Sequence, residues 1–410
     1  MWIDFTQSIG QRLELQQLNQ EQNRSKNLRN KGAAIVRGVA GSGKSLVLRN
    51  RVEKLLEDYD RILVLTYNRF MNGWLKSQFD LNQHNKIECK TFHQWAYKYL
   101  KYSYADDVNK LVDLASKSSQ RYQAILIDEA QDFCDQWFQA LLEVLDSRTK
   151  ALFIVYDNTQ SVYGQAHRRK ADWSWKNLGI KIPGGRSQVF DVNYRNSPEI
   201  LEVAWKFIVP ALETAGIKVE QRTRDETGKV IYTPSIGSII EPKKKSSRSS
   251  GIKPLLLEVY YEDMPDKIAY EVQSALNTHS ESSIGILVHP QAKDLKSEIS
   301  KELTALNIDH HAPETSRDRD GNVVHRPYII VDSWNALKGV EFDAVIIAGV
   351  DSLSEYKSEN AEIEFEAKAG LYTAMTRAKD HLVMLYENPD QTVTEIEAAL
   401  NSANCLLEVI

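Results

Sequence analysis

One loop constrains the fold of this 410-residue chain more than any other feature. The segment GVAGSGKS (38–45) follows the apolar run AAIV (33–36) and opens an amphipathic stretch (44–59). It fits the pattern G-x-x-x-x-G-K-[ST], in which glycines let backbone N–H groups curl around the phosphates of a nucleotide. The bound anion also sits on the positive end of the following helix. The sequence therefore predicts an α/β domain with a nucleotide site built from Gly38, Gly41, Ser42, Gly43, Lys44 and Ser45.

An ordinary glycine-rich turn between a strand and a helix is the alternative interpretation, and the flanking pattern counts against it. A second acidic segment also favours the nucleotide site. The residues DEAQD (128–132) end another apolar run, and buried carboxylates at a strand end are costly unless a cation lies beside them. Taken alone, such a turn would be an acidic helix N-terminus that uses the helix dipole.

Together with the loop, these acids have a chemical role. Asp128 and Ser45 are predicted to hold Mg²⁺, while Lys44 reaches the β- and γ-phosphates of ATP. Glu129 would orient and deprotonate the water that attacks the γ-phosphate. The sequence thus predicts Mg²⁺-dependent hydrolysis of ATP.

Short apolar runs alternate with helical patterns along the chain, which predicts parallel sheets covered by helices on both faces. The expected strands are 33–36, 61–66, 86–90, 124–128 and 151–156, then 255–260, 284–289, 328–333 and 344–349. Expected helices include 44–59, 136–145 and one around 197–213, which Asn196 or Ser197 would cap with Pro198 as its first residue. We expect two α/β domains, residues 1–187 and 188–410.

Composition limits the function classes. The net charge of −5 gives no overall attraction to nucleic acid, so such binding needs a local basic groove. Cys89, Cys134 and Cys405 are far apart without metal-ligand spacing, which is typical of reduced thiols in a cytoplasmic protein. No apolar run approaches the roughly 18 residues of a membrane span, and the first residues lack the pattern of a signal peptide.

Further segments occur in a recognisable order. They are LNQEQ (18–22), LTYNR (65–69), TFHQWA (91–96), YDNTQSVYG (156–164), NYRNS (193–197), LKGVEFDAVII (337–347) and YTAMTRAKDHL (372–382). With the loop and DEAQD, this ordered set resembles the superfamily 1 helicases of the UvrD/Rep type over about residues 18 to 385. The resemblance implies two tandem RecA-like domains with ATP in the cleft between them.

The resemblance also implies roles for single residues around the nucleotide. Gln22 and Tyr194 would contact adenine, and Glu341 would bind the ribose. Gln160 would sense the γ-phosphate and couple it to DNA. Arg195 and Arg377 would reach the γ-phosphate from the second domain, where the transition state needs positioned cations.

The same resemblance indicates where a single strand of DNA binds. Basic grooves with aromatic platforms hold such strands, because every base has a face on which a ring can stack. The candidates from these motifs are Tyr67, Asn68, Arg69, Thr91, Phe92, His93, Tyr163, Trp173 and Trp175. Gln165 stands where related proteins carry a base-stacking tryptophan, and Trp173 or Trp175 is expected to replace it. Trp95, at helical spacing from Phe92, is expected to be a core residue.

Two functions remain open at this level. The first is an ATP-dependent translocase or helicase on single-stranded DNA, with RNA as an alternative strand and 3′-to-5′ polarity implied by the resemblance. The second is an ATPase switch, regulated by nucleic acid or a partner, that serves a nuclease or other effector. Only residues 94–127 and 290–332 lie where UvrD-type proteins carry long insertions, so we expect a two-domain motor without them. The basic loop 241–251 is expected to be solvated or to touch nucleic acid.

Overall fold

The computed structural model describes residues 2–3, 18–79, 85–103, 105–161, 173–235, 237–244, 252–319, 328–356 and 361–404. The chain forms two compact α/β units. The N-terminal unit comprises Leu15–Val192 and Lys218–Pro242, and the C-terminal unit comprises Met1–Glu14, Asn193–Ile217 and Lys243–Ile410. Among the described residues, no helix is both long and apolar enough to cross a membrane.

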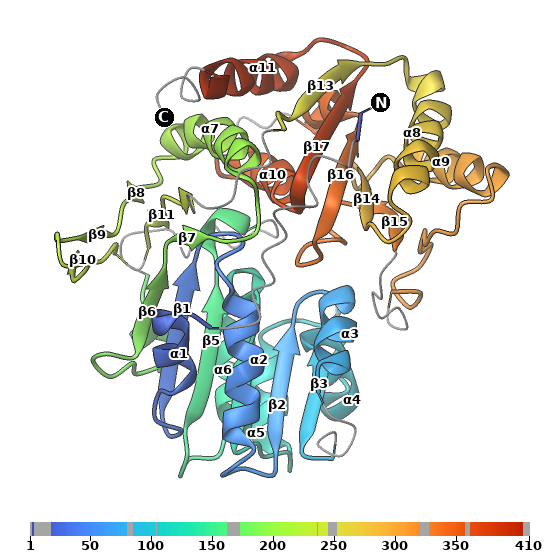
Figure 1. Ribbon diagram of the computed structural model, residues 1–410. Helices are drawn as coiled ribbons and strands as arrows, with labels where there is room; N and C mark the ends of the chain where they lie inside the picture. Colours follow the sequence, from blue (N-terminus) through green and yellow to red (C-terminus); the bar gives the residue numbers. More distant parts are fainter. Residues whose placement is uncertain are drawn as a thin grey trace. The chain divides into compact units, whose positions relative to one another are not determined.

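The N-terminal unit is built on a parallel sheet with the strand order β3-β2-β4-β5-β1-β6 among the described residues (Figure 1). Its strands are β1 (Ala33–Gly38), β2 (Ile62–Thr66), β3 (Ile87–Thr91), β4 (Ala124–Ile127), β5 (Ala151–Tyr156) and β6 (Ser187–Phe190). Strands β1, β4 and β5 are buried along their whole length, as expected for a sheet covered on both faces.

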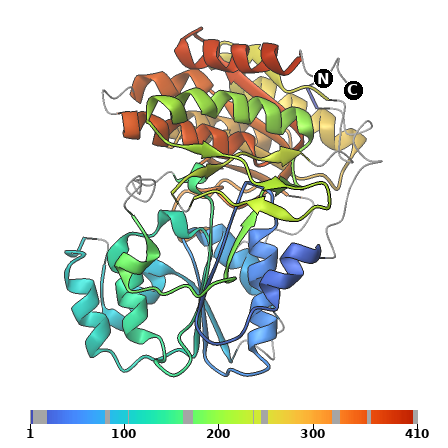
Figure 2. The ribbon, with the colours of Figure 1, turned by 90° about the vertical axis from the view of Figure 1, so that its left-hand side faces the viewer.

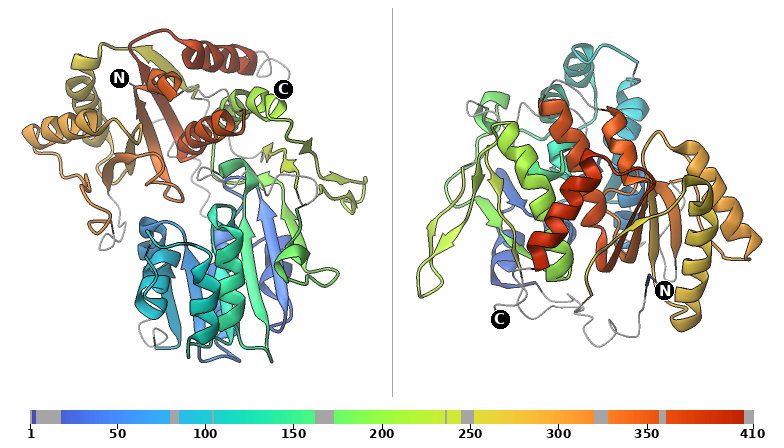
Figure 3. Two further views of the ribbon diagram at one scale, coloured as in Figure 1. Left: turned by 180° about the vertical axis from the view of Figure 1, so that it is seen from behind. Right: turned by 90° about the horizontal axis from the view of Figure 1, so that it is seen from above.

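Helices cover both faces of this sheet. They are α1 (Gln20–Lys26), α2 (Lys44–Leu55), α3 (Arg69–Ser77), α4 (Phe92–Leu100), α5 (Lys110–Lys117) and α6 (Asp135–Val144). Helices α2 and α3 share one hydrophobic core with the sheet, and α4, α5 and α6 share the other. Figure 1 shows α2 over one face, and the left view of Figure 3 shows α5 and α6 over the opposite face. Consecutive residues of β1, such as Ile35 and Val36, therefore enter different cores.

The C-terminal unit has a second parallel sheet, with the order β13-β17-β16-β14-β15 in the described part of the chain. Its strands are β13 (Leu255–Glu258), β14 (Ile284–Val288), β15 (Ile329–Ser333), β16 (Phe342–Ala348) and β17 (Ala378–Tyr386). Its helices are α7 (Pro198–Thr214), α8 (Met264–Thr278), α9 (Lys293–Ala305), α10 (Ala361–Met375) and α11 (Gln391–Asn404). Helices α10 and α11 pack against α7 (Figure 2), and α8 packs against α9.

The chain leaves the N-terminal unit after Val192 and returns to it for Lys218–Pro242. The expected boundary near residue 188 lies inside β6, which pairs with β1. The returning segment carries β8 (Val219–Glu220), β9 (Thr223–Arg224), β10 (Val230–Tyr232) and β11 (Ile239–Ile240). Two more short strands, β7 (Val192–Asn193) and β12 (Lys243–Lys244), lie where the chain passes between units. The sequence gives no signal for this return.

The predicted helix cap is confirmed in detail. Ser197 is the N-cap of α7 and accepts a hydrogen bond from the Ile200 backbone at 3.5 Å, with Pro198 as the first helical residue. The predicted parallel α/β fold is also confirmed in both units. Strands β6 and β17, which lay outside the expected set, occupy an edge and an interior position.

Candidate nucleotide-binding site and strand-binding residues

The phosphate-binding loop has the geometry that its glycines allow. It joins β1 to α2, and Gly41 and Gly43 adopt φ values of 64° and 84°, where side chains with a Cβ are strained. A Cβ on Gly43 would lie 2.5 Å from Nε2 of Gln22. Glycine is therefore required at residue 43 both by the backbone and by its neighbour.

Lys44 lies inside this loop. Its ammonium group donates to the carbonyl oxygens of Gly38 at 3.0 Å and Val39 at 2.8 Å, and it lies 3.7 Å from Oδ2 of Asp157. The side chain is only 9% exposed. The loop thus holds a buried cation at the carboxyl ends of β1 and β5, where parallel sheets bind ligands.

Asp128 follows β4 and is 1% exposed. Its Oδ1 accepts a hydrogen bond from the Glu129 backbone at 2.9 Å, whereas Oδ2 is buried without a hydrogen-bond partner. Burial and the neighbouring Glu129 raise the pKa of Asp128, and the Ser45 hydroxyl and the Lys44 ammonium partly offset this. An unsatisfied carboxylate oxygen next to a serine hydroxyl is a donor set that suits a hydrated Mg²⁺ ion.

Glu129 is held in a strained backbone conformation. Its φ of 52° is rare for a residue other than glycine. Its carboxylate accepts a hydrogen bond from Nε2 of Gln131, and Oε1 of Gln131 accepts one from the Asp157 backbone at 3.0 Å. The strained turn and Gln131 together fix where this carboxylate points.

Asp157 connects these groups to Gln160. Its Oδ2 accepts a hydrogen bond from Nε2 of Gln160 at 2.7 Å, and its Oδ1 accepts one from the Thr159 backbone at 3.0 Å. Since Asp157 also faces Lys44, one carboxylate joins the phosphate-binding loop to the residue expected to sense the γ-phosphate. The Asp157 side chain thus bridges Lys44 and Gln160.

Gln22, expected to contact adenine, is fully buried and contacts the loop itself. Its Nε2 donates to the Ser42 carbonyl at 3.0 Å, and its Oε1 accepts from the Asn19 backbone at 2.9 Å. The second contact belongs to a capping box that starts α1. Each end of the amide can form one more hydrogen bond, so it retains one donor and one acceptor.

The returning segment holds α1 through ion pairs. Arg222 donates to Glu21 at 2.9 Å and to the Val189 carbonyl at 2.7 Å. Arg224 makes two hydrogen bonds to the fully buried Asp191, at 2.9 and 2.8 Å. Residues from the segment after α7 therefore brace the helix that carries Gln22.

In the C-terminal unit, Arg195 and Glu341 lie together. Arg195 Nε donates to Glu341 at 2.6 Å, and Lys379 lies 3.2 Å from the other carboxylate oxygen. Although partial burial favours the neutral form, Lys379 and Arg195 hold the pKa of Glu341 below its usual range. Tyr194 precedes this pair and is half-buried.

Arg377 lies in the C-terminal unit, two residues after the end of α10. It is 1% exposed, and its Nε donates to the Thr373 carbonyl at 2.9 Å. The structure thus places Arg377 in a buried turn, with part of its guanidinium committed to helix carbonyls.

Two of the expected strand-binding residues are helix caps. Asn68 accepts a hydrogen bond from the Phe70 backbone at 2.7 Å and begins α3. Thr91 accepts one from the Gln94 backbone at 3.3 Å and begins α4. Arg69 is the first residue of α3. These residues lie at the carboxyl ends of β2 and β3, on the same edge of the sheet as the phosphate-binding loop.

The aromatic candidates form a cluster around Trp137. Phe92 has no exposed surface and stacks on Trp137 with ring centroids 4.0 Å apart. Tyr67 and His93 contact the same indole from partly buried positions. Trp95 is a core residue, as expected.

The expectation that Phe92 and Trp175 stack on bases is corrected. Phe92 is fully buried and Trp175 is 3% exposed in the same core, and a ring without a solvent-exposed face cannot receive a base. Trp173 packs at 4.9 Å from Trp175 and is partly exposed. Tyr163 lies outside the described residues, as does Gln165.

Comparisons with known proteins assign the family. Residues 20–166 match the family described as an AAA domain, and residues 328–385 match the UvrD-like helicase C-terminal domain. The C-terminal match is to the UvrD-like helicases. The two matched regions contain the phosphate-binding loop and the Glu341 and Arg377 segments of this UvrD-like chain. No curated protein matches it in sequence.

Solved structures similar to this UvrD-like chain include two helicases. The arterivirus nonstructural protein 10 helicase in complex with DNA is 10% identical with a TM-score of 0.39, covering 92% of this chain and 65% of its own. The C-terminal domain of a possible DNA helicase from Lactobacillus plantarum WCFS1 is 14% identical with a TM-score of 0.30, covering 50% of this chain and 96% of its own. The chain thus spans less than two thirds of the length of the viral helicase.

Two residues of this site were not predicted from the sequence. Gln131 orients Glu129, and Asp157 receives Lys44 and Gln160. A signal existed for Asp157, because it directly follows a buried strand, as Asp128 does. Gln131 gave none, since its role depends on the fold of the turn.

Proposed function

We propose that the protein is an ATP-dependent translocase on single-stranded DNA that unwinds short duplexes with 3′-to-5′ polarity. The observation that carries the proposal is the continuous set of contacts from Lys44 through Asp157 to Gln160. A motor needs the state of the γ-phosphate to alter residues beyond the nucleotide, and this set of contacts supplies a physical route.

In the proposed reaction, Lys44 leaves the loop carbonyls and binds the β- and γ-phosphates. Mg²⁺, held by Ser45 and Asp128, supplies neutralising charge at the phosphate oxygens when bound. Glu129 accepts the proton of the attacking water, and Gln131 fixes the carboxylate in the required direction. Arg195 and Arg377 stabilise the charge that spreads over the γ-phosphate in the transition state.

Recognition of the nucleoside is assigned to three residues. Adenine presents one acceptor and one donor, N7 and the N6 amino group, on one edge. The remaining donor and acceptor of Gln22 match that edge once nucleotide binding exposes the amide, which is fully buried in this structure. Tyr194 supplies an aromatic face against the base, and Glu341 accepts from the ribose hydroxyls after exchanging part of its contact with Arg195.

The proposed DNA strand lies along the ends of β2 and β3. Tyr67 and His93 keep partial exposure there, and Arg69 supplies a cation for phosphate; the partly exposed Trp173, beside Trp175, is proposed to extend the surface. Tyr163, which lies outside the described residues, is proposed as a further strand contact from its motif alone. Asn68 and Thr91 contribute by starting the two helices whose N-termini face that edge.

A strand-displacement assay tests the proposal. The substrate is a short duplex with a single-stranded 3′ or 5′ tail, incubated with Mg²⁺ and ATP, with Glu129→Gln as the inactive control. The expected result is displacement of the 3′-tailed duplex alone. Hydrolysis of ATP without displacement of either duplex would instead favour a switch that serves a nuclease or other partner.

A further inference from the structure

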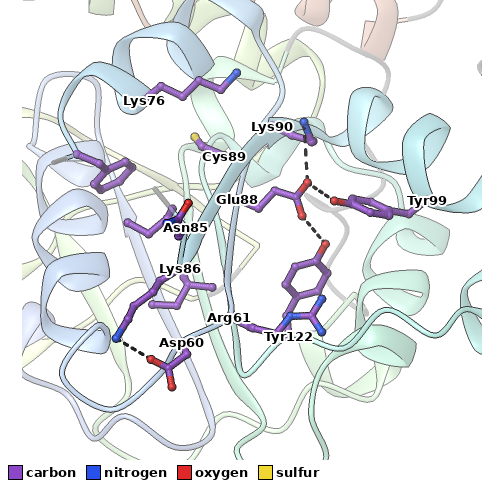
Figure 4. Close-up of a pocket in the computed structure, with 13 residues that line it drawn as sticks. Asp60, Arg61, Lys76, Asn85, Lys86, Glu88, Cys89, Lys90, Tyr99 and Tyr122 are labelled. Atoms are coloured by element: carbon purple, nitrogen blue, oxygen red, sulfur yellow. Dashed lines mark hydrogen bonds and ion pairs between the residues drawn. The ribbon is translucent and has the colours of Figure 1, made fainter. Parts of the chain in front are cut away.

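A pocket of about 510 Å³ lies along β3, the edge strand that β2, β4 and β5 separate from β1 and its phosphate-binding loop. We call it the edge groove. Its lining residues are Asp60, Arg61, Ile62, Lys76, Phe79, Asn85, Lys86, Ile87, Glu88, Cys89, Lys90, Tyr99 and Tyr122. Figure 4 looks onto it, with Lys76 and Lys90 at one end and the Asp60–Lys86 pair at the other.

The floor of the edge groove is an unpaired strand edge. Strand β3 pairs only with β2 among the described residues. Because Ile62 donates to the Lys86 carbonyl, Lys86, Glu88 and Lys90 direct their backbone groups toward β2. Ile87 and Cys89 then direct theirs outward, where no described residue pairs with them. The backbone N–H and C=O groups of Ile87 and Cys89 can therefore form hydrogen bonds with a short extended chain.

The walls make this edge a groove. Ile87 and Cys89 are packed under the face covered by α3, while Glu88 and Lys90 are on the face of α4. Lys76 of α3 and Tyr99 of α4 line the pocket from the two sides. A strand added to β3 would therefore lie between these two helices.

The charges in the edge groove are unequal. Asp60 pairs with Lys86 at 2.6 Å. Glu88 accepts hydrogen bonds from Tyr99 at 2.5 Å and Tyr122 at 2.7 Å, and Lys98 lies 3.3 Å away. Both carboxylates are thus already neutralised.

Positive charge is left over at the other end. Lys76 has no acidic partner among the described residues, and Lys90 lies only within 3.9 Å of Glu88. Burial, together with the ammonium groups of Lys98 and Lys76, lowers the pKa of Lys90. These ammonium groups repel one another, and Lys90 shares Glu88 with Lys98 and two tyrosine hydroxyls, so a second anion would be favoured beside Lys76 and Lys90.

We propose that the edge groove receives an extended acidic segment of a partner protein, which pairs with the outer edge of β3 and places a carboxylate between Lys76 and Lys90. Main-chain hydrogen bonds provide affinity in such strand addition, and side-chain charge provides selection. The lysines also disfavour pairing with a second copy of β3, which carries the same charges. The groove thus admits an acidic strand and excludes the chain itself.

The position of the groove has a consequence for the proposed motor. It extends along β3 from Asn85 to Lys90, whereas the phosphate-binding loop follows β1, which β2, β4 and β5 separate from β3 in the sheet. A partner bound at β3 would leave the phosphate-binding loop accessible. We therefore expect recruitment without inhibition of ATP hydrolysis.

Peptide binding to the full-length protein tests this inference. The probe is a fluorescein-labelled hexapeptide that alternates aspartate with valine, followed by fluorescence anisotropy. Two control peptides carry N-methyl groups on alternate backbone amides or lysine in place of aspartate. Lys76→Glu is compared with Lys54→Glu, at a partly exposed lysine of α2 that pairs with Glu57, and hydrogen exchange locates the bound peptide.

We expect the acidic peptide to bind and to slow backbone hydrogen exchange in residues 85–91. Lys76→Glu is expected to weaken binding about tenfold or more and to leave basal ATP hydrolysis unchanged, while Lys54→Glu binds as the wild type does. Equal binding of the N-methylated peptide would overturn strand addition. Absence of binding at millimolar peptide, or displacement of the peptide from residues 85–91 by a single-stranded oligonucleotide, would overturn an acidic protein partner.

Discussion

At the scale of single residues, Asp157 has the widest set of contacts in the candidate site. It faces Lys44, accepts from Gln160 and bonds to Gln131 through its backbone. In the proposed function, Asp157 loses one partner when Lys44 moves to the nucleotide and keeps Gln160, the proposed γ-phosphate sensor. The freed Asp157–Gln160 pair is then the part of the site that changes with nucleotide state.

Asp157→Asn tests this role with little change in volume. We expect the stimulation of ATP hydrolysis by single-stranded DNA to fall about tenfold, because loss of a charge-assisted hydrogen bond costs roughly 1.5–3 kcal/mol. Basal hydrolysis should fall less. Steady-state ATPase assays with and without DNA measure both, with the exposed Asp113→Asn as control. Equal loss of both rates would assign Asp157 to chemistry alone.

Glu341 gives a prediction for acid stability. Lys379 and Arg195 lower its pKa in the folded protein, so its stabilising contribution is present above the unfolded pKa near ~4.3 and is lost as pH falls through the folded pKa. Glu341→Gln should therefore flatten the loss of stability below about pH 5. Its cost at pH 7 should stay under about 1 kcal/mol, since the side chain is 42% exposed.

Hydrogen exchange of β16 and β17 measures this local stability from pH 6 down to about pH 3. The exposed Glu281→Gln in the same unit serves as the control. If the stability of Glu341→Gln depends on pH as that of the wild type does, Lys379 and Arg195 do not lower the pKa of Glu341 in this way.

At the scale of elements, α1 links the returning segment to the phosphate-binding loop. Arg222 holds Glu21 on this helix, and the next residue, Gln22, bonds to Ser42. A helix of seven residues is unstable alone, so its position depends on these contacts. The segment from Lys218 to Pro242 therefore acts on the nucleotide site through α1, and its Ile240 also packs directly against Val39 of the phosphate-binding loop.

Glu21→Gln should raise KM for ATP about fivefold to tenfold with a change in kcat below about twofold, because it loosens α1 and leaves Glu129 and Lys44 in place. Initial-rate measurements over a range of ATP concentrations separate the two constants. Glu57→Gln, at an exposed site after α2, should leave both unchanged. A fall in kcat at constant KM would refute the positioning role of α1.

The sequence predicted the elements better than their contacts. Buried runs such as Ala151–Tyr156 identify strands because a parallel sheet tolerates few polar side chains, and Ser197 before Pro198 marks a helix start in local terms. The burial of Phe92 was not predictable from its motif, since it depends on Trp137, which lies on another helix. The contact between Gln22 and Ser42 likewise depends on how α1 packs.

At the scale of the whole molecule, the order of the chain differs from the order of its folded units. The N-terminal unit is completed by Lys218–Pro242, which follows α7 of the other unit. Arg37, buried in β1, donates to the carbonyls of Pro234 and Ser235. Asp191, fully buried, takes its cation from Arg224. A cut near residue 188 would separate Arg37 from these carbonyls and would take both Asp191 and Arg224 away from the N-terminal unit.

Two fragments test this interleaving. Residues 18–192 joined through a Gly/Ser linker to 218–242 should unfold in one cooperative thermal transition. Residues 18–192 alone should melt roughly 10 °C lower, because an unpaired buried charge costs about 3–5 kcal/mol. Circular dichroism and calorimetry compare them, and equal melting temperatures would show that the returning segment is not needed for this unit.

The most direct test of the proposed function is steady-state ATP hydrolysis with and without single-stranded DNA, in the wild type and in Glu129→Gln. We predict that DNA strongly stimulates ATP hydrolysis by the wild type. The hydrolysis rate should fall about 100-fold or more in Glu129→Gln, which still binds ATP. Hydrolysis that is indifferent to DNA, or that survives Glu129→Gln, would contradict a nucleic-acid-driven motor with Glu129 as its base.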